Sequence, residues 1–169
     1  MVRRTLTCVP RQRHRQPGRV VRIPLGDGMV GWGRQLRSVR VEFYDRFDAE
    51  TDAAQVDPRE VTRCQVAFTI AVMDRAFRRT SGWALLEVVP LSEKEQAEVY
   101  RSFKQYPGGA LSIYWEKPDG SYGEDNATRA ACEGLERSAV WDPEHVEDRL
   151  RDHRAGRPNK WVESIALKD

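Results

Sequence analysis

An alternating pattern near the N-terminus constrains the fold most strongly, because it predicts a β-hairpin. Apolar and polar side chains alternate along residues 19–25, a Gly-Asp-Gly turn follows at 26–28, and the chain returns along 29–36. Glycine and aspartate tolerate the positive φ that tight hairpin turns require. Pro24 cannot donate a backbone hydrogen bond, so its strand is expected to lie at a sheet edge or to be bulged there.

The rest of the chain is expected to contain more strands than helices. Period-two alternation and bounding Gly and Pro residues predict further strands, followed by turns rather than by crossover helices. These strands are expected at residues 38–45, 65–73, 82–89, 110–117 and 121–123, with a last strand possible at 160–167.

Two segments have helix signals. Ser92 and Glu95 have the spacing of a capping box at the start of a helix over 91–104. Asp142-Pro143 begins a second helix, which Gly156 ends. A short helical or turn connection is expected at 74–81. The acidic segment 46–63 has few apolar residues and is interpreted as an exposed loop.

These elements predict an α+β fold with a mainly antiparallel, strongly bent β-sheet, partly open and barrel-like, with a C-terminal helix and one or two shorter helices. Residues 1–18 carry prolines and arginines but almost no apolar periodicity, so a basic, flexible tail is expected there. Residues 19–169 are expected to form a single α+β domain.

The charge is divided unevenly along the chain. Residues 1–40 contain ten arginines and one acid, a net charge of +9, whereas residues 41–169 have a net charge of −7. The basic segment favours a small-barrel nucleic-acid-binding protein as one alternative. The acidic body instead favours a basic protein partner. A mean hydropathy of −0.68 without an apolar run near 18 residues excludes a membrane-spanning helix.

The acidic residues of the body fall into three groups, which are the candidate partner-binding residues. Carboxylates grouped on a surface attract a basic partner over long range. The groups are Asp45, Asp48, Glu50 and Asp52; Asp119, Glu124 and Asp125; and Glu144, Glu147 and Asp148, with Asp142 beside the last group.

No residue pattern predicts catalysis, a metal site or a cofactor. Three cysteines without C-x-x-C spacing favour idle or buried thiols. His145 and His153 lie about 12 Å apart on the predicted helix, too far to share a metal ion; His153 is expected to be packed and hydrogen-bonded. Gly31 and Gly33 leave room for another element to cross their strand closely. The five tryptophans are interpreted as core and rim aromatics.

Two stretches resemble the Imm26 family of immunity proteins. The first is Ile-Pro-Leu-Gly-Asp-Gly-Met-Val-Gly-Trp-Gly-Arg at 23–34, followed by Val-Glu-Phe-Tyr-Asp at 41–45. The second is Phe-Thr-Ile-Ala-Val-Met-Asp at 68–74, followed by Ser-Gly-Trp at 81–83 and Pro-Leu at 90–91. The resemblance covers about Val20 to Leu91, and motifs for the remaining segments are not matched.

The resemblance implies a bacterial immunity protein that binds and neutralises a cognate polymorphic toxin by stoichiometric occlusion, without catalysis and without a cofactor. A basic nuclease is one kind of toxin that an acidic surface would suit. The N-terminus lacks the apolar stretch of a secretory signal, so a cytoplasmic location is expected.

Overall fold

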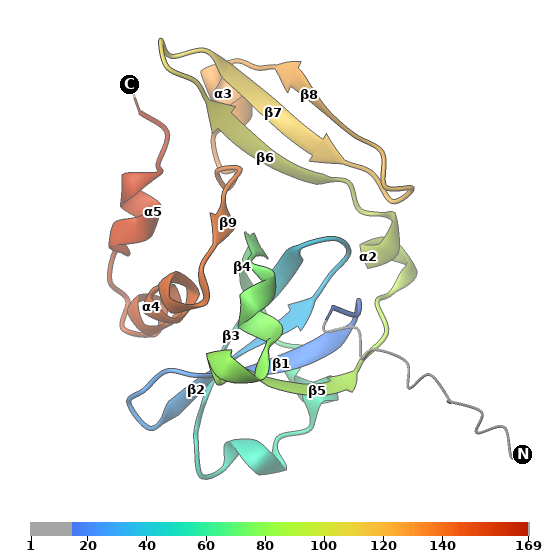
Figure 1. The fold of residues 1–169 in the computed structure, drawn as a ribbon, viewed down its shortest axis with the longest axis vertical. Helices are drawn as coiled ribbons and strands as arrows, with labels where there is room; N and C mark the ends of the chain where they lie inside the picture. The colour runs from blue at the N-terminus through green and yellow to red at the C-terminus, as the bar shows by residue number, and fades with distance from the viewer. Residues whose placement is uncertain (1–14, 169) are drawn as a thin grey trace, which may run out of the picture.

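The computed structural model describes residues 15–168, which form two β-sheets with helices around them (Figure 1). The larger sheet has six strands in the order β5-β1-β2-β3-β4-β9, and the smaller has three in the order β6-β7-β8. The bounds are β1 Arg19–Pro24, β2 Met29–Gln35, β3 Arg40–Ala49, β4 Val66–Val72, β5 Ala84–Val88, β6 Tyr100–Gln105, β7 Leu111–Glu116, β8 Tyr122–Asn126 and β9 Val140–Trp141.

The helices are short, with one exception. Helix α4, Pro143–Arg154, has twelve residues. The others are α1 Pro58–Val61, α2 Glu93–Ala97, α3 Arg129–Cys132 and α5 Lys160–Ser164, with 3-10 turns at Ala53–Gln55, Asp74–Phe77 and Arg79–Ser81. All strand pairs are antiparallel except β4 with β9. The predicted α+β class with a mainly antiparallel sheet is therefore confirmed, although neither sheet closes into a barrel.

The first hairpin forms as predicted. Val21 pairs with Gly33 and Ile23 with Gly31 in the β1–β2 ladder. Strand β1 is not an edge strand, since β5 pairs with its other side. That pairing ends at Arg22, so no residue of β5 pairs with Pro24, which has no N–H group to donate. A bulge in the same pairing lies between Arg19 and Val21.

Each face of the larger sheet has its own hydrophobic core, because successive side chains of a strand point to opposite faces. Val41, Phe43, Ile70 and neighbouring side chains pack on one face against helix α4. Trp32 and Tyr44 belong to the other face.

The segment 46–63 covers that second face and is not the exposed acidic loop that the sequence predicted. Strand β3 continues through it to Ala49, and the turns that follow bury Ala53 and Val61, which is 0% exposed. Ala53, Val56 and Val61 contribute to this core from irregular spacings, so they form no periodic apolar pattern in the sequence.

Helix α4 crosses the larger sheet closely at Gly31. A β-carbon on Gly31 would lie 3.1 Å from Cδ1 of Leu150, which is fully buried. The prediction that glycine leaves room for a crossing element is confirmed at Gly31, whereas the close neighbours of Gly33 belong to the adjacent strand β3. Helix α4 itself begins after Asp142 as predicted, and the left-handed Gly156 (φ 63°) follows its end.

Two predictions about the second half of the chain are wrong. The helix expected over 91–104 ends at Ala97, although its capping box is present, and Tyr100–Gln105 forms strand β6 instead. Residues 160–167, expected as a strand, form helix α5, capped by Asn159. Helix α3 and strand β9 were not predicted.

Residues 1–14 of the expected tail lie outside the described residues. Of the four that are described, Gly18 hydrogen-bonds to Gln35 and accepts from Val89, with distances of 2.7 and 2.8 Å. The boundary of the domain at residue 19 stays a prediction.

Candidate interaction surfaces

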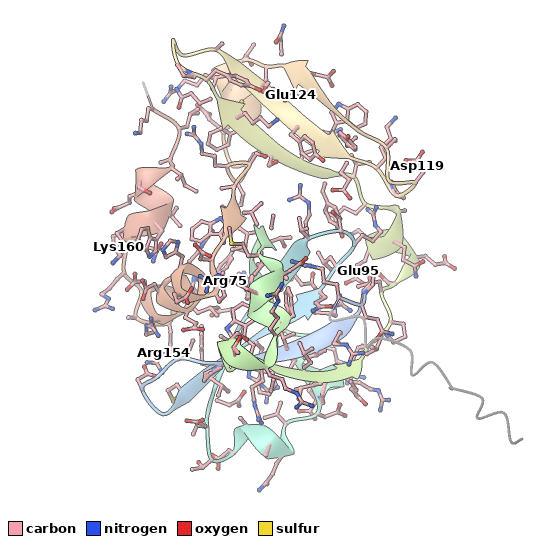
Figure 2. The ribbon with its side chains drawn as sticks, in the orientation of Figure 1. Arg75, Glu95, Asp119, Glu124, Arg154 and Lys160 are labelled. Carbon is pink, nitrogen blue, oxygen red and sulfur yellow. The ribbon has the colours of Figure 1, made fainter. Side chains whose placement is uncertain are left out.

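The structure places the three acidic groups in separate regions. The first lies at the end of β3 and the turn after it, the second on the β7–β8 hairpin and the third on α4. Figure 2 shows Asp119 and Glu124 on the smaller sheet, far from Arg154 at the end of α4. The ten candidate residues therefore do not form one continuous acidic surface.

Four of these carboxylates accept hydrogen bonds from tryptophan indoles. Such bonds satisfy the indole N–H while the ring stays packed, and they turn the carboxylates toward the fold. The pairs are Trp32 with Asp48 at 2.8 Å, Trp83 with Glu147 at 2.9 Å, Trp115 with Asp125 at 2.8 Å and Trp161 with Asp148 at 2.9 Å. The interpretation of the tryptophans as core and rim aromatics holds, with Trp32, Trp83 and Trp141 buried.

The other candidate carboxylates differ in how far the fold uses them. Glu144 pairs with Arg75, and Asp45 lies 3.1 Å from Nε2 of His153. Within residues 15–168, Glu50, Asp52 and Asp119 form no ion pair and are exposed. Asp125 and Glu147 also form no ion pair within these residues, but each accepts an indole hydrogen bond.

The β6–β8 sheet has one face rich in tyrosine and serine, which we call the tyrosine face. The register places Tyr100, Tyr122 and Glu116 side by side, and Ser102, Tyr114 and Glu124 beside them. The ring of Tyr122 is near the ring of Tyr114, and Tyr122 is 72% exposed. The sequence analysis did not find this face, because it assigned Tyr100 and Ser102 to a helix.

Glu124 is the centre of a hydrogen-bond network on this face. It accepts bonds from Lys104, at 2.6 Å, and from Ser112 and Tyr106. The bond from Lys104, followed by those from the two hydroxyls, lowers the pKa of Glu124 to about 2. The carboxylate therefore stays charged across the physiological range and fixes the surrounding side chains.

We predict that Glu124 titrates with a midpoint near pH 2 in a carbon-13 NMR titration of its carboxyl group. Because the pKa is depressed in the folded state, the stabilisation from this carboxylate is present above its unfolded pKa of about 4.3 and is lost as the pH falls toward 2. Lys104→Met should raise the midpoint toward the unfolded value, whereas Lys94→Met, on helix α2, should not. An ordinary midpoint in the unaltered protein would contradict this network.

Most of the arginines between residues 15 and 40 form ion pairs or hydrogen bonds with other parts of the fold. Arg15 pairs with Asp74, Arg34 with Glu42, and Arg37 donates to the carbonyl of Lys117 at 3.0 Å. Arg19 donates to the carbonyl of Leu86 at 2.9 Å. Guanidinium groups held in this way are not free to contact phosphates, so these four arginines do not favour the nucleic-acid alternative. His14 and the arginines before it lie outside the described residues.

The two histidines that the structure describes, His145 and His153, contact other side chains. The His145 ring stacks on Trp161 with centroids 3.7 Å apart. His153 is hydrogen-bonded to Asp45, as predicted, but its side chain is partly exposed rather than fully packed. Within residues 15–168, no group of His, Cys, Asp and Glu could hold a metal ion, and no helix is long and apolar enough to cross a membrane. Cys64 and Cys132 are free thiols.

Comparison with known proteins identifies the class of protein as an immunity protein. The family model described as Immunity protein 26 (Imm26) matches residues 16–107, which is more than half of the chain. The chain belongs to the Imm26 family. No curated protein and no solved structure matches. The matched region extends from the first hairpin to the end of β6, so β7, β8 and helix α4 lie outside it.

Proposed function

We propose that this protein neutralises a cognate protein toxin in the bacterial cytoplasm by binding it stoichiometrically and covering its active surface. The observation that carries the proposal is membership of the Imm26 family. Inhibition by occlusion requires a complementary surface but no catalytic group, cofactor or metal ion. The partner is a polymorphic toxin of the kind used in interbacterial competition, and a basic nuclease fits the acidic body best.

We place the centre of the contact on the β7–β8 hairpin. Tyrosine supplies a large contact area at a low cost in side-chain entropy, and tyrosines are enriched among the residues that dominate binding energy. Tyr122 and Tyr114 lie on this hairpin with Glu124, and Asp119 is exposed in its turn. The hairpin also lies outside the family match, where a contact specific to one toxin can differ without changing the shared scaffold.

The group at the end of β3 adds long-range attraction in this proposal. Glu50 and Asp52 are exposed and have no ion pair within the described residues, and Asp45 and Asp48 lie beside them. Exposed charges of one sign speed up encounter with a partner of the opposite sign. The group on α4, Glu144, Glu147 and Asp148, is bound more fully within the fold, so its share of the contact is expected to be smallest.

Co-expression tests the proposed function. A toxin domain encoded beside this gene is expressed with and without the protein in the same bacterial host, and growth is measured. Rescue of growth, together with co-purification of the two chains, is expected. Continued growth arrest at a confirmed level of this protein would overturn the proposal.

We predict that Tyr122→Ala weakens toxin binding by about thirtyfold, since an interface tyrosine that dominates binding contributes about 2 kcal/mol. Isothermal titration calorimetry with the purified toxin domain measures the effect. Met73→Ala, which truncates another exposed apolar side chain away from the tyrosine face, is the matched control and should leave the affinity unchanged. Equal affinities for the two variants would place the contact elsewhere.

A further inference from the structure

Two adjoining depressions lie between the larger and the smaller sheet. One has a volume of about 630 Å³ and the other of about 230 Å³, and Arg40 and Glu136 line both. Residues of β3, β4 and β6 line both depressions, and Figure 1 shows β3 and β4 below β6. We call the two depressions together the inter-sheet cleft.

Arg40 in this cleft is a buried cation without a counter-ion. It is 8% exposed, and its side chain forms no hydrogen bond or ion pair within residues 15–168. The guanidinium lies over the Tyr100 ring, 5.0 Å from its centroid. Burial lowers the pKa of Arg40, and the attraction of Glu116 offsets this only in part. Buried charges in proteins are normally paired, because desolvation of an unpaired one is costly.

Two hydroxyl groups beside Arg40 are also buried without a partner. The Nε atom of Arg40, the hydroxyl of Tyr100 and the hydroxyl of Ser102 are each solvent-shielded and unbonded. Tyr100 is 5% exposed and Ser102 3%. The two residues lie on the tyrosine face of β6, whereas Arg40 begins β3, so the donors reach the cleft from both sheets. Unsatisfied buried donors are rare, so these three require an acceptor from outside the chain, either ordered water or a ligand.

The charge of the cleft limits the kind of ligand. A guanidinium with neighbouring hydroxyl donors matches the two oxygens of a carboxylate. Four carboxylates also line the cleft. Glu42 and Glu136 are held in ion pairs with Arg34 and Arg149, whereas Glu98 and Glu116 form no ion pair within the described residues. Their carboxylates repel a dianion more strongly than a monoanion. A singly charged carboxylate therefore fits better than a doubly charged phosphate.

We propose that the inter-sheet cleft is a binding site for a small organic carboxylate, whose oxygens accept hydrogen bonds from Arg40, Tyr100 and Ser102. The site holds the two sheets together through the ligand, because its donors come from both. This inference goes beyond toxin binding and does not depend on it. It concerns the contents of a cleft that shares Tyr114 with the proposed toxin contact.

The direct test uses the full chain and benzoate as the probe. The Nε–H group of Arg40 gives its own signal in a proton–nitrogen NMR spectrum, assigned by its loss in Arg40→Lys. Benzoate is expected to shift this signal in a saturable way, and benzamide, its uncharged analogue, is expected to leave it in place. Inorganic phosphate at pH 8 should bind at least about tenfold more weakly than benzoate. A shift that does not saturate with benzoate, or that is the same with benzamide, would overturn the proposal.

A second measurement separates a ligand-binding role of Arg40 from a structural one. Arg40→Met should abolish the saturable benzoate shifts in the backbone signals of Tyr100 and Ser102 and should raise Tm, because it removes an unpaired buried charge. Arg63→Met, which replaces an exposed arginine outside the cleft, should keep both the benzoate response and the original Tm. A lower Tm for Arg40→Met with benzoate binding retained would show that Arg40 serves the fold alone. If this variant fails to fold, the benzoate titration of the unaltered protein still tests the proposed binding site.

Discussion

Replacing Glu42 by alanine is expected to lower the free energy of unfolding by about 3 kcal/mol, which would be a large fraction of the stability of a domain of this size. Arg34 and Glu42 are 4% and 7% exposed, and Nε of Arg34 lies 2.7 Å from Oε1 of Glu42. Without Glu42 the buried guanidinium loses its buried counter-ion and Tyr44 loses the acceptor of its hydroxyl. Glu95, which also pairs with Arg34, keeps the loss at the lower end of the range for broken buried pairs.

Urea denaturation of Glu42→Ala and of two further variants measures this effect. Glu50→Ala, which removes an exposed carboxylate from the same region of sequence, should change the free energy of unfolding by less than about 0.5 kcal/mol. The double variant Arg34→Met, Glu42→Leu should regain much of the lost stability, because no buried charge is left unpaired. Equal stabilities of Glu42→Ala and Glu50→Ala would mean that the pair contributes nothing.

Leu150→Ala is expected to lower the free energy of unfolding by about 3–5 kcal/mol, the range for a fully buried leucine whose removal leaves a cavity. Leu150 lies on helix α4, is 0% exposed and packs against the strand that contains Gly31. The result would show that α4, although outside the region that matches the family, is part of the hydrophobic core. Thermal and urea denaturation give the value.

A double-mutant cycle with Gly31→Ala makes this prediction more specific. In the unaltered protein the new methyl group would lie 3.1 Å from Leu150, so Gly31→Ala should destabilise by overpacking. In the Leu150→Ala background the same methyl group enters the cavity and should cost less, giving a coupling energy above about 0.5 kcal/mol. Additive effects would contradict the close crossing of α4 over Gly31.

The elements that the sequence predicts correctly are those with local signals. The Gly-Asp-Gly turn and the period-two flanks define the β1–β2 hairpin, and the Asp142-Pro143 start defines α4. Within residues 91–104 the capping box at Ser92 indicates a helix start, and Val99 and Phe103 are four residues apart. The spacing is compatible with both a helix and a strand, and pairing with β7 decides in favour of β6. In this segment the tertiary contacts, and not the local propensity, determine the structure.

The candidate surfaces were predictable only in part. Charge counting finds the acidic groups, because it needs no knowledge of neighbours. It does not find which carboxylates are used internally, since the indole partners of Asp48 and Glu147 lie 16 and 64 residues away. The tyrosine face follows from the register of β6, and the unpaired side chain of Arg40 follows from how the two sheets pack, so both depend on the tertiary fold. The prediction of an α+β immunity protein did not depend on these details.

The measurement that tests the central claim most directly is a titration of toxin activity with this protein. Purified toxin domain, encoded beside the gene, is assayed at a fixed concentration well above the dissociation constant while the protein is added. Stoichiometric binding predicts a linear fall in activity that ends at one equivalent, with no further change on longer incubation. Full toxin activity at a large excess of the protein, or inactivation by a small fraction of an equivalent that progresses with time, would contradict neutralisation by occlusion.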